Sequence, residues 1–437
     1  RGLPFLLLAL VGYFLTLREN GPFLEATRRL GQALVTGGGL LFLFAVNAPA
    51  GLLAFFGRLL TPFGLAALAG LLLSAAAFWG MLRSPTAQAL HAKTGHEQAI
   101  SGWLFLSPNL LGFLIFFAGP LLLSFYFSFT DSDAFNPPNW VGLDNYAKIL
   151  NVTVKPLETP EQPAREVVDI KVYDEVGRLT IGGRGLLFAA EDRFFWLALR
   201  NTLLYALLVI PLSVIPALVL ANILNSKLPG MKFFRAVYFI PSIAATVGIA
   251  LVWQWLYNAT VGYINYFITL AVNFLNNTLH LGLVDPQIRW VSDARTALLA
   301  IVIIGAWQTV GFNTVLFLAG LQNIPGELYE AATVDGANSL QKFFKITIPM
   351  LAPSMFYVLT TTTIQALQVF EQVFILMNPP EGPNNSTLTL VLYLYRSGFQ
   401  NFKQGYASAL AWVLFVIIFG ITLYQFRQQR RSSIYES

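Results

Sequence analysis

Long apolar runs separated by short polar stretches dominate the chain and predict a bundle of membrane-spanning helices. Several of these runs exceed the ~20 residues that an α-helix needs to cross the hydrocarbon core of a bilayer. Helices are the expected spanning structure, because in lipid every backbone group must find its hydrogen bond within the segment. The predicted spans are residues 33–56, 59–82, 100–129, 196–224, 237–257, 297–321, 351–376 and 406–426.

Two further apolar runs are less suited to span a bilayer. Residues 3–17 are few for a span, and residues 261–281 are interrupted by asparagines, which is typical of a helix at the membrane interface. If residues 3–17 do span, the chain has nine spans and begins outside. If they lie on the membrane surface, it has eight spans and begins inside, and the sequence leaves both alternatives open.

One sizeable polar segment, residues 131–193, interrupts the series of spans. Apolar and polar residues alternate over residues 167–181, around the stretch from Asp174 to Gly177, and this pattern predicts a β-hairpin centred there. A segment of this length forms a small cap. The cap either contacts an external partner or is a decorated loop.

The polar stretch 330–353 lies between two apolar runs and predicts a helix–turn–helix. Asn323 is expected to cap the first helix. Gly336 permits a break in the chain, after which Asn338 or Ser339 can cap a second short helix. The residues alone are compatible with a docking element at the membrane surface and with an ordinary loop between spans.

The composition agrees with a polytopic membrane protein and helps to orient it. Apolar residues make up 56% of the chain and charged residues 11%, and the formal net charge of +5 lies in loops, so we expect no nucleic-acid partner. Basic residues are concentrated in residues 225–236 and in the tail from Arg427, which places both in the cytoplasm by the positive-inside rule. Counting spans then puts residues 330–349 in the cytoplasm. The segments expected outside are 131–193, 258–295 and 379–404.

The sequence offers no set of residues for catalysis. It has no glycine-rich phosphate-binding loop ending in Gly-Lys-Ser/Thr, and it has no cysteine. His91, His96 and His280 lack the spacing of a zinc site. We therefore predict a chain that is not an enzyme, holds no metal and depends on another chain for any work with ATP.

Amide side chains inside two predicted spans are candidate substrate contacts, because polar groups are costly in lipid and tend to face a cavity or a partner. Gln365, Gln368 and Gln372 have the spacing i, i+3, i+7, which places them on one helical face of the penultimate span, with Glu371 adjacent. The preceding span contributes a second cluster, formed by Gln308, Thr309, Phe312 and Asn313.

Amide groups beside aromatic rings suit sugars, whose hydroxyls need donors and acceptors while their C–H faces prefer an apolar surface. The alternative interpretation is interhelical hydrogen bonding within the bundle. Both interpretations remain open from the residues alone.

A pattern of fixed spacing runs through the polar stretch: Glu330, Ala331, Ala332, Gly336, Ile346 and Pro349. It resembles the EAA loop of binding-protein-dependent ABC importer permeases, in which this loop is a coupling helix that sits in a cleft of the ATP-binding subunit. The resemblance implies ATPase contacts at Glu330, Ala331, Ala332, Asp335, Gly336, Ala337, Phe343, Ile346 and Pro349.

The resemblance covers residues 101–428 and is similar in detail to maltose-type carbohydrate permeases. Its matching segments are 140–146, 233–241, 395–399 and 405–410. The positions that contact maltose in that family correspond to Gly305, Gln308, Thr309 and Phe312. Gln308 and Thr309 depart from the family's residue types, which argues against maltose itself. Glu371 follows Phe370 where related permeases carry aspartate.

The resemblance implies an all-α polytopic fold, with a six-helix permease core, two or three extra N-terminal spans and a small external insert. The expected domains are residues 1–99 (extra spans and linker), 100–130 (first core span), 131–195 (insert), 196–426 (core, with coupling loop 322–350) and 427–437 (cytoplasmic tail).

The implied function is that of one permease subunit of an ATP-driven importer of di- or oligosaccharides in a bacterial or archaeal inner membrane. Its expected partners are a second permease, two copies of a cytoplasmic ATP-binding subunit that bind ATP and Mg, an extracytoplasmic sugar-binding protein, and lipid. A stand-alone secondary carrier or channel is the rival, and it predicts an internal repeat and intramembrane acid pairs, neither of which the sequence displays.

Overall fold

The structure is a computed structural model that describes residues 24–45, 94–159, 161–181, 184–225 and 230–434, with the isolated positions 4, 10, 11 and 57. The chain divides into two compact units, Arg1–Phe116 and Phe117–Ser437. The first unit contains α2 (Leu24–Ala45) and α6 (Thr94–Phe113). Helix α2 covers part of the predicted span 33–56. The predicted run 59–82 lies outside the described residues, as does the run 3–17 apart from isolated positions.

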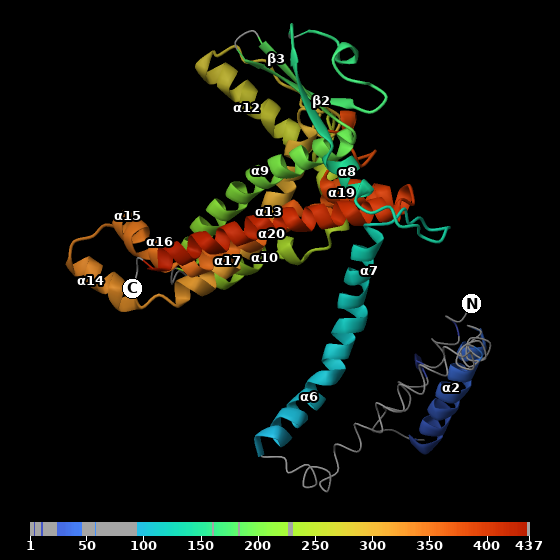
Figure 1. The fold of residues 1–437 in the computed structure, drawn as a ribbon. Coiled ribbons are helices and arrows are strands. Elements are labelled where there is room, and N and C mark those ends of the chain that lie inside the picture. The colour runs from blue at the N-terminus through green and yellow to red at the C-terminus, as the bar shows by residue number, and fades with distance from the viewer. Residues whose placement is uncertain are drawn as a thin grey trace. The chain divides into compact units, whose positions relative to one another are not determined.

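A π-helical turn joins α6 to the second unit, which is mostly helical (Figure 1). Its helices are α7 (Gly119–Phe127), α8 (Asp144–Leu150), α9 (Arg193–Leu224), α10 (Met231–Ile243), α11 (Thr246–Leu256), α12 (Tyr263–Leu279), α13 (Ala297–Gln322), α14 (Gly326–Val334), α15 (Ser339–Lys342), α16 (Ile348–Met350), α17 (Ala352–Leu367), α18 (Glu371–Leu376), α19 (Leu390–Tyr395) and α20 (Gln404–Ile434). Shorter turns are η1 (Leu114–Ala118), η2 (Ala164–Glu166), η3 (Phe343–Thr347), η4 (Pro383–Asn385) and η5 (Arg396–Gln400).

Four described helices are long and apolar enough to cross a membrane, and they match four of the predicted spans. They are Phe105–Phe127, Arg193–Leu224, Ala297–Gln322 and Gln404–Gln429. Two bent pairs, Phe233–Ile243 with Thr246–Leu256 and Ser339–Met350 with Ala352–Leu367, bring the number to six if each pair is one span.

The predicted span over residues 237–257 is broken into two helices rather than continuous. The chain bends by 96° between α10 and α11. Pro241 lies in the last turn of α10, where it removes a backbone donor, and Ala244 and Ala245 are extended. The prediction of a continuous helix over residues 351–376 is wrong, because α17 ends at Leu367 and α18 begins at Glu371.

The segment between α7 and α9 forms a small antiparallel sheet rather than the simple hairpin that we expected. Its strands are β1 (Val152–Leu157), β2 (Asp174–Ile181) and β3 (Arg184–Ala190), in the order β1-β3-β2. The predicted centre of the hairpin is wrong, since Asp174 to Gly177 belong to β2, which has a register shift between Glu175 and Gly177. Leu187 and Ala189 of the central strand are fully buried. The fold class is therefore mostly helical with a three-stranded sheet.

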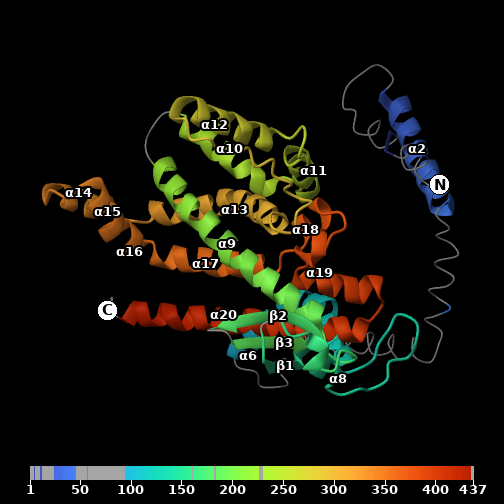
Figure 2. The same ribbon diagram turned by 90° about the horizontal axis from the view of Figure 1, so that it is seen from above.

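Helices α9 and α13 pack along each other at the centre of the second unit. Their contact is close at Gly305, where a Cβ atom would overlap with the hydroxyl of Tyr205. A second buried cluster, which includes Phe317, Leu321, Ile324, Leu351 and Val358, joins α13 to α17. Figure 2 shows α14 and α15 projecting beyond these helices, at the end where α20 finishes. Two long helices thus lead from the buried centre to one projecting element.

Candidate functional site

The segment from α14 to α16, Gly326–Met350, forms the predicted helix–turn–helix and is called here the α14–α16 hairpin. Gly336 makes the turn with φ +78°, a conformation that residues with a Cβ rarely adopt. Asn338 caps the second helix: its side chain accepts from the backbone N–H of Gln341, whose side chain accepts in return from the backbone of Asn338. Both sequence predictions are confirmed at these positions.

The predicted cap of the first helix is wrong. Asn323 ends α13 instead, because its N–H bonds back to the carbonyl of Gly320 and continues the last turn. Ile324, only 9% exposed, then anchors the chain in the cluster between α13 and α17. Helix α14 begins after Pro325 without a side-chain cap. Burial of an apolar side chain, rather than a polar cap, fixes where this helix begins.

Hydrogen bonds tie the two arms of the α14–α16 hairpin to each other. The hydroxyls of Tyr329 and Thr347 lie 2.9 Å apart, and Thr347 is 2% exposed. The Lys342 ammonium donates to the Thr333 hydroxyl at 2.7 Å. Because Tyr329 also packs against the cluster between α13 and α17, the hairpin is fastened to both helices.

The outer surface of the hairpin carries apolar side chains that nothing in the described part of the chain covers. Val334 is 89% exposed, and Leu340 and Phe344 are also largely exposed. Glu330 is exposed and has no hydrogen-bond or ion-pair partner among the described residues. Exposed apolar patches of this kind mark interaction surfaces. Sequence reasoning missed Val334 and Leu340, although their apolar character within a polar stretch was a usable signal.

The other hairpin residues predicted to contact the ATPase differ in their exposure. Ala331, Asp335 and Pro349 are exposed, whereas Ala332, Ala337, Phe343 and Ile346 are half-buried. The N–H of Ala337 bonds to the carbonyl of Ala332, which closes the turn.

A cavity of about 540 Å³, called here the glutamine cavity, lies among α9, α11, α13, α17 and α18. Its polar lining comprises Tyr205, Thr246, Thr309, Thr362, Gln365, Gln368, Glu371 and Gln372, with Phe370 beside them. The predicted glutamines therefore do come together. Tyr205, Thr246, Thr362 and Phe370 were not predicted, and Tyr205, a hydroxyl group within an apolar run, was the clearest available signal.

The reason given for the glutamines from the sequence is wrong. They do not share one helical face, because α17 ends at Leu367 and residues 368–370 are not helical. The Thr389 hydroxyl donates to the Val369 carbonyl and holds this non-helical segment. The chain turns there, and α18 carries Gln372 back toward α13, where its amide donates to Gln308 at 3.1 Å.

Two predicted substrate contacts have packing roles in the structure. Asn313, 1% exposed, and the Thr362 hydroxyl hydrogen-bond between α13 and α17 at 3.1 Å. Gly305 provides the space for Tyr205. Thr309 lines the cavity while its hydroxyl donates to the Gly305 carbonyl. Phe312 is exposed on α13 and is not part of the lining.

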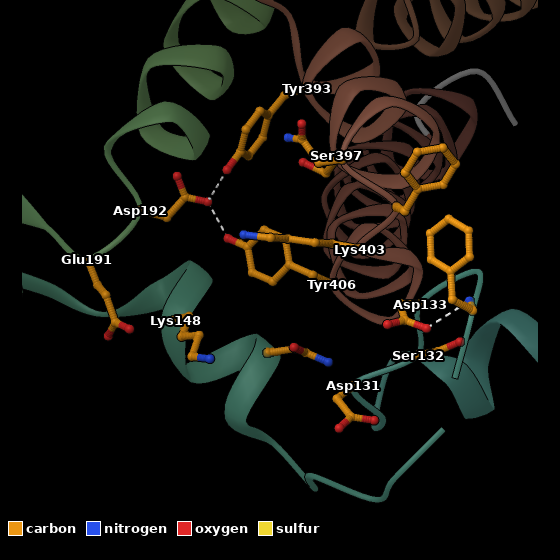
Figure 3. Close-up of a pocket in the computed structure, with 14 residues that line it drawn as sticks. Asp131, Ser132, Asp133, Lys148, Glu191, Asp192, Tyr393, Ser397, Lys403 and Tyr406 are labelled. Carbon is orange, nitrogen blue, oxygen red and sulfur yellow. Dashed lines mark hydrogen bonds between the residues drawn. The ribbon is translucent and has the colours of Figure 1, made fainter. Parts of the chain in front are cut away.

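A second cavity of about 660 Å³, called here the Asp192 cavity, lies where β3 meets α9 (Figure 3). Asp192 caps α9 by accepting from the N–H of Phe195. Its other oxygen accepts from the hydroxyls of Tyr393, at 2.7 Å, and Tyr406. Burial, together with the nearby Asp192 carboxylate, raises the pKa of the Tyr393 hydroxyl. One carboxylate thus joins the ends of α9, α19 and α20.

Comparison with known families decides the identity of the chain. Residues 185–433 match the model of the binding-protein-dependent transport system inner membrane component. The chain belongs to this family. It is thus a permease, a transport component of the inner membrane, and the glutamine cavity and the α14–α16 hairpin both lie within the matched residues. Among the described residues, no group of three or more His, Cys, Asp or Glu could hold a metal ion.

Relatives of known name are similar over most of this permease. It is 34% identical to the probable ABC transporter permease protein YesP of Bacillus subtilis, over 77% of this chain and 93% of the relative. It is 31% identical to the arabinooligosaccharides transport system permease protein AraP of the same organism, over 75% and 88%. It is 30% identical to the trehalose/maltose transport system permease protein MalF of Thermococcus litoralis, over 76% and 95%.

A solved structure shares the fold. A chain of a bacterial ABC transporter involved in the import of the acidic polysaccharide alginate aligns with a TM-score of 0.56 and 22% identity, over 78% of this permease and 99% of that chain. The likeness agrees with the mostly helical architecture and with the four to six candidate spans found among the described residues.

Proposed function

We propose that this permease forms half of the translocation pathway of an ATP-driven importer of di- or oligosaccharides. The observation that carries the proposal is a polar cavity among spans whose helices lead directly to an exposed hairpin. Relatives at about 30% identity are named for arabinooligosaccharides and for trehalose and maltose. Amides, hydroxyls and the Phe370 ring in the glutamine cavity suit the hydroxyls and C–H faces of sugars.

The α14–α16 hairpin is the proposed contact with a cytoplasmic ATP-binding subunit, and Glu330 to Pro349 supply the docking residues. Its exposed apolar side chains fit a protein cleft. ATP and Mg then belong to two copies of that partner, because this sequence has no phosphate-binding loop. The hairpin and the C-terminal tail lie in the cytoplasm in this arrangement.

Transport follows an alternating-access mechanism in which closure of the ATPases moves the hairpin. Helix α13 runs from Thr309 at the cavity to Asn323 at the hairpin, a distance of roughly 21 Å at 1.5 Å per residue. Helix α17 makes a second connection, since Leu351 is fully buried in the cluster that holds the hairpin and Gln365 lines the cavity. Interlocked helices transmit a displacement because packed cores are poorly compressible.

A second permease completes the pathway, and an extracytoplasmic sugar-binding protein delivers the substrate. The small sheet and the Asp192 cavity belong to the outer face in this topology. Phe135 and Phe402 line the Asp192 cavity and are exposed, and the centroids of their rings lie 5.2 Å apart. This aromatic pair gives the outer face an apolar contact point. The family's dependence on a binding protein supports this arrangement.

Reconstitution tests the proposal. The permease is assembled in vesicles with its partner chains, and ATP hydrolysis is followed with a panel of monosaccharides, disaccharides, oligosaccharides and polyols. Stimulation by one sugar class supports the proposal. Purification without any ATPase chain, or turnover that responds to no sugar, would overturn it in favour of a stand-alone carrier for another solute.

A further inference from the structure

The described lining of the glutamine cavity carries a negative charge and no positive charge. Glu371 is the one charged side chain among the described residues that line it, and its carboxylate is exposed. Glu371 has no hydrogen-bond or ion-pair partner among the described residues. The remaining polar lining consists of amides and hydroxyls, which can serve a sugar hydroxyl as donor or acceptor.

No cation lines the cavity with this carboxylate among the described residues, and the two arginines of α9, Arg193 and Arg200, lie on that helix before its wall residues Tyr205 and Val209. The sequence contains no Asp, Glu, Lys or Arg in residues 201–226, 236–284, 296–326, 346–370 and 404–426. The wall residues contributed by α9, α11, α13 and α17 all lie within these stretches. With low-dielectric helices around it, a single unpaired charge sets the sign of the local potential.

We propose that Glu371 acts as a charge filter, so that the glutamine cavity accepts neutral and amino sugars and rejects sugar acids. The inference rests on the proposed sugar pathway and adds its substrate class. A uronate carboxylate entering the cavity meets Glu371 without a compensating cation, whereas a neutral sugar meets only amides and hydroxyls and an ammonium group is attracted. Glu371 is a specificity-determining residue in this scheme, and its neighbour Gln372 is held to α13 through Gln308.

The cysteine-free sequence permits a direct measurement of the potential. The Gln368→Cys variant, which replaces an exposed side chain of the cavity lining, is assembled with the partner chains and treated with a cationic or an anionic methanethiosulfonate of matched size. The cationic reagent is expected to react faster. Glu371→Gln should lower the ratio of the two rates about tenfold, and Glu371→Asp should retain it.

Two controls make this outcome specific. Ser292→Cys, exposed outside the cavity, should give a rate ratio that Glu371→Gln leaves unchanged. The same treatment of a complex that contains the natural, cysteine-free permease measures how much of the reagent reacts with the partner chains. A rate ratio for the Gln368→Cys variant that is the same with glutamate and with glutamine at position 371 would overturn the charge filter.

Protection experiments then connect the potential to the substrate. A neutral oligosaccharide should slow labelling of Gln368→Cys at concentrations at least tenfold below those needed for the same oligosaccharide with a terminal uronate. Glu371→Gln should bring the two concentrations together. Equal protection by both sugars in the natural background contradicts the filter, whereas protection by no sugar contradicts the proposed sugar pathway and leaves the reagent ratio as a separate result.

Discussion

Gly326 begins α14 and Gly336 lies just after its end, and a Cβ at either would meet open space, yet only Gly336 has a positive φ. A Cβ at position 336 therefore strains the backbone at the turn without meeting any neighbour, at a cost of about 1 kcal/mol. We expect Gly336→Ala to reduce sugar-stimulated ATP hydrolysis severalfold, and Gly336→Pro to abolish it because proline also removes the N–H that bonds to the Thr333 carbonyl.

Gly326→Ala is the matched control, since alanine there adds a methyl group in open space at an ordinary backbone angle. Its stimulated hydrolysis should equal that of the unmodified complex. Full stimulation of the Gly336→Pro complex would refute the role of this turn in coupling.

Substitutions at Asn313 and Gln308 distinguish the two roles considered for polar residues inside the spans, interhelical hydrogen bonding and contact with the substrate. Asn313→Ala leaves the Thr362 hydroxyl, 2% exposed, without its partner, and we expect a loss of about 1–3 kcal/mol in the free energy of unfolding. Gln308→Ala frees Gln372 beside a cavity, where water or sugar can replace the bond, so sugar uptake should fall while thermal unfolding changes little. The reverse pattern would exchange their roles.

At the scale of elements, hydrophobic runs located the helices well, but they did not reveal where the chain bends. Residues 196–224, 297–321 and 406–426 became long helices because their apolar runs match the length of a span. The bend after Ile243 follows Pro241, but the break after Leu367 depends on a tertiary partner, the Thr389 hydroxyl that satisfies the Val369 carbonyl. A periodicity argument that assumes one helix has no access to such partners.

The residues of the candidate site could be predicted from the kinds of side chain in the apolar runs, but their arrangement in space could not. Gln365, Gln368 and Gln372 were identified because amides are rare in apolar runs, and a broken helix brings them together with Tyr205, which lies far away in the sequence. The sheet was found only as a hairpin, because β1 pairs with β3 across a polar segment that has no clear alternation. Contacts between residues far apart in the sequence could not be predicted from this one sequence.

The hydrogen bonds of Asp192 to Tyr393 and Tyr406 predict that the stability of the fold decreases at alkaline pH. The ordinary pKa of tyrosine is 10.0, and burial with the nearby Asp192 carboxylate raises that of Tyr393 in the folded state. The unfolded chain therefore releases a proton that the folded chain retains, so the free energy of unfolding should decrease as the pH rises above about 10. Tyr393→Phe should reduce this decrease in thermal unfolding of the purified complex.

Tyr424→Phe is the control for that experiment, because Tyr424 is 67% exposed at the other end of α20. It should leave the pH dependence as it is in the natural chain. If both phenylalanine variants give the same curve as the natural chain, Tyr393 does not contribute to the junction at Asp192 in the way that the structure indicates.

At the scale of the whole molecule, assembly with the ATPase should depend on the tip of the α14–α16 hairpin. Val334→Asp places a charge on an exposed apolar side chain, and we expect the ATPase to be lost from the complex during affinity purification of the permease. Val284→Asp provides a close match, because Val334 is 89% and Val284 is 88% exposed. Retention of the ATPase by both variants would show that it docks elsewhere.

The interruption between α17 and α18 has a consequence for the permeability of the membrane. Backbone that leaves a helix at the level of the spans is tolerated where protein covers it or water reaches it. Residues 368–370 line the glutamine cavity, so we expect water to occupy it when no substrate is present, and a sugar on the proposed pathway would exchange its hydration shell there. Between the cavity and the hairpin, the buried apolar side chains of Phe317, Leu321 and Leu351 pack together, so water in the cavity is not expected to continue between these helices.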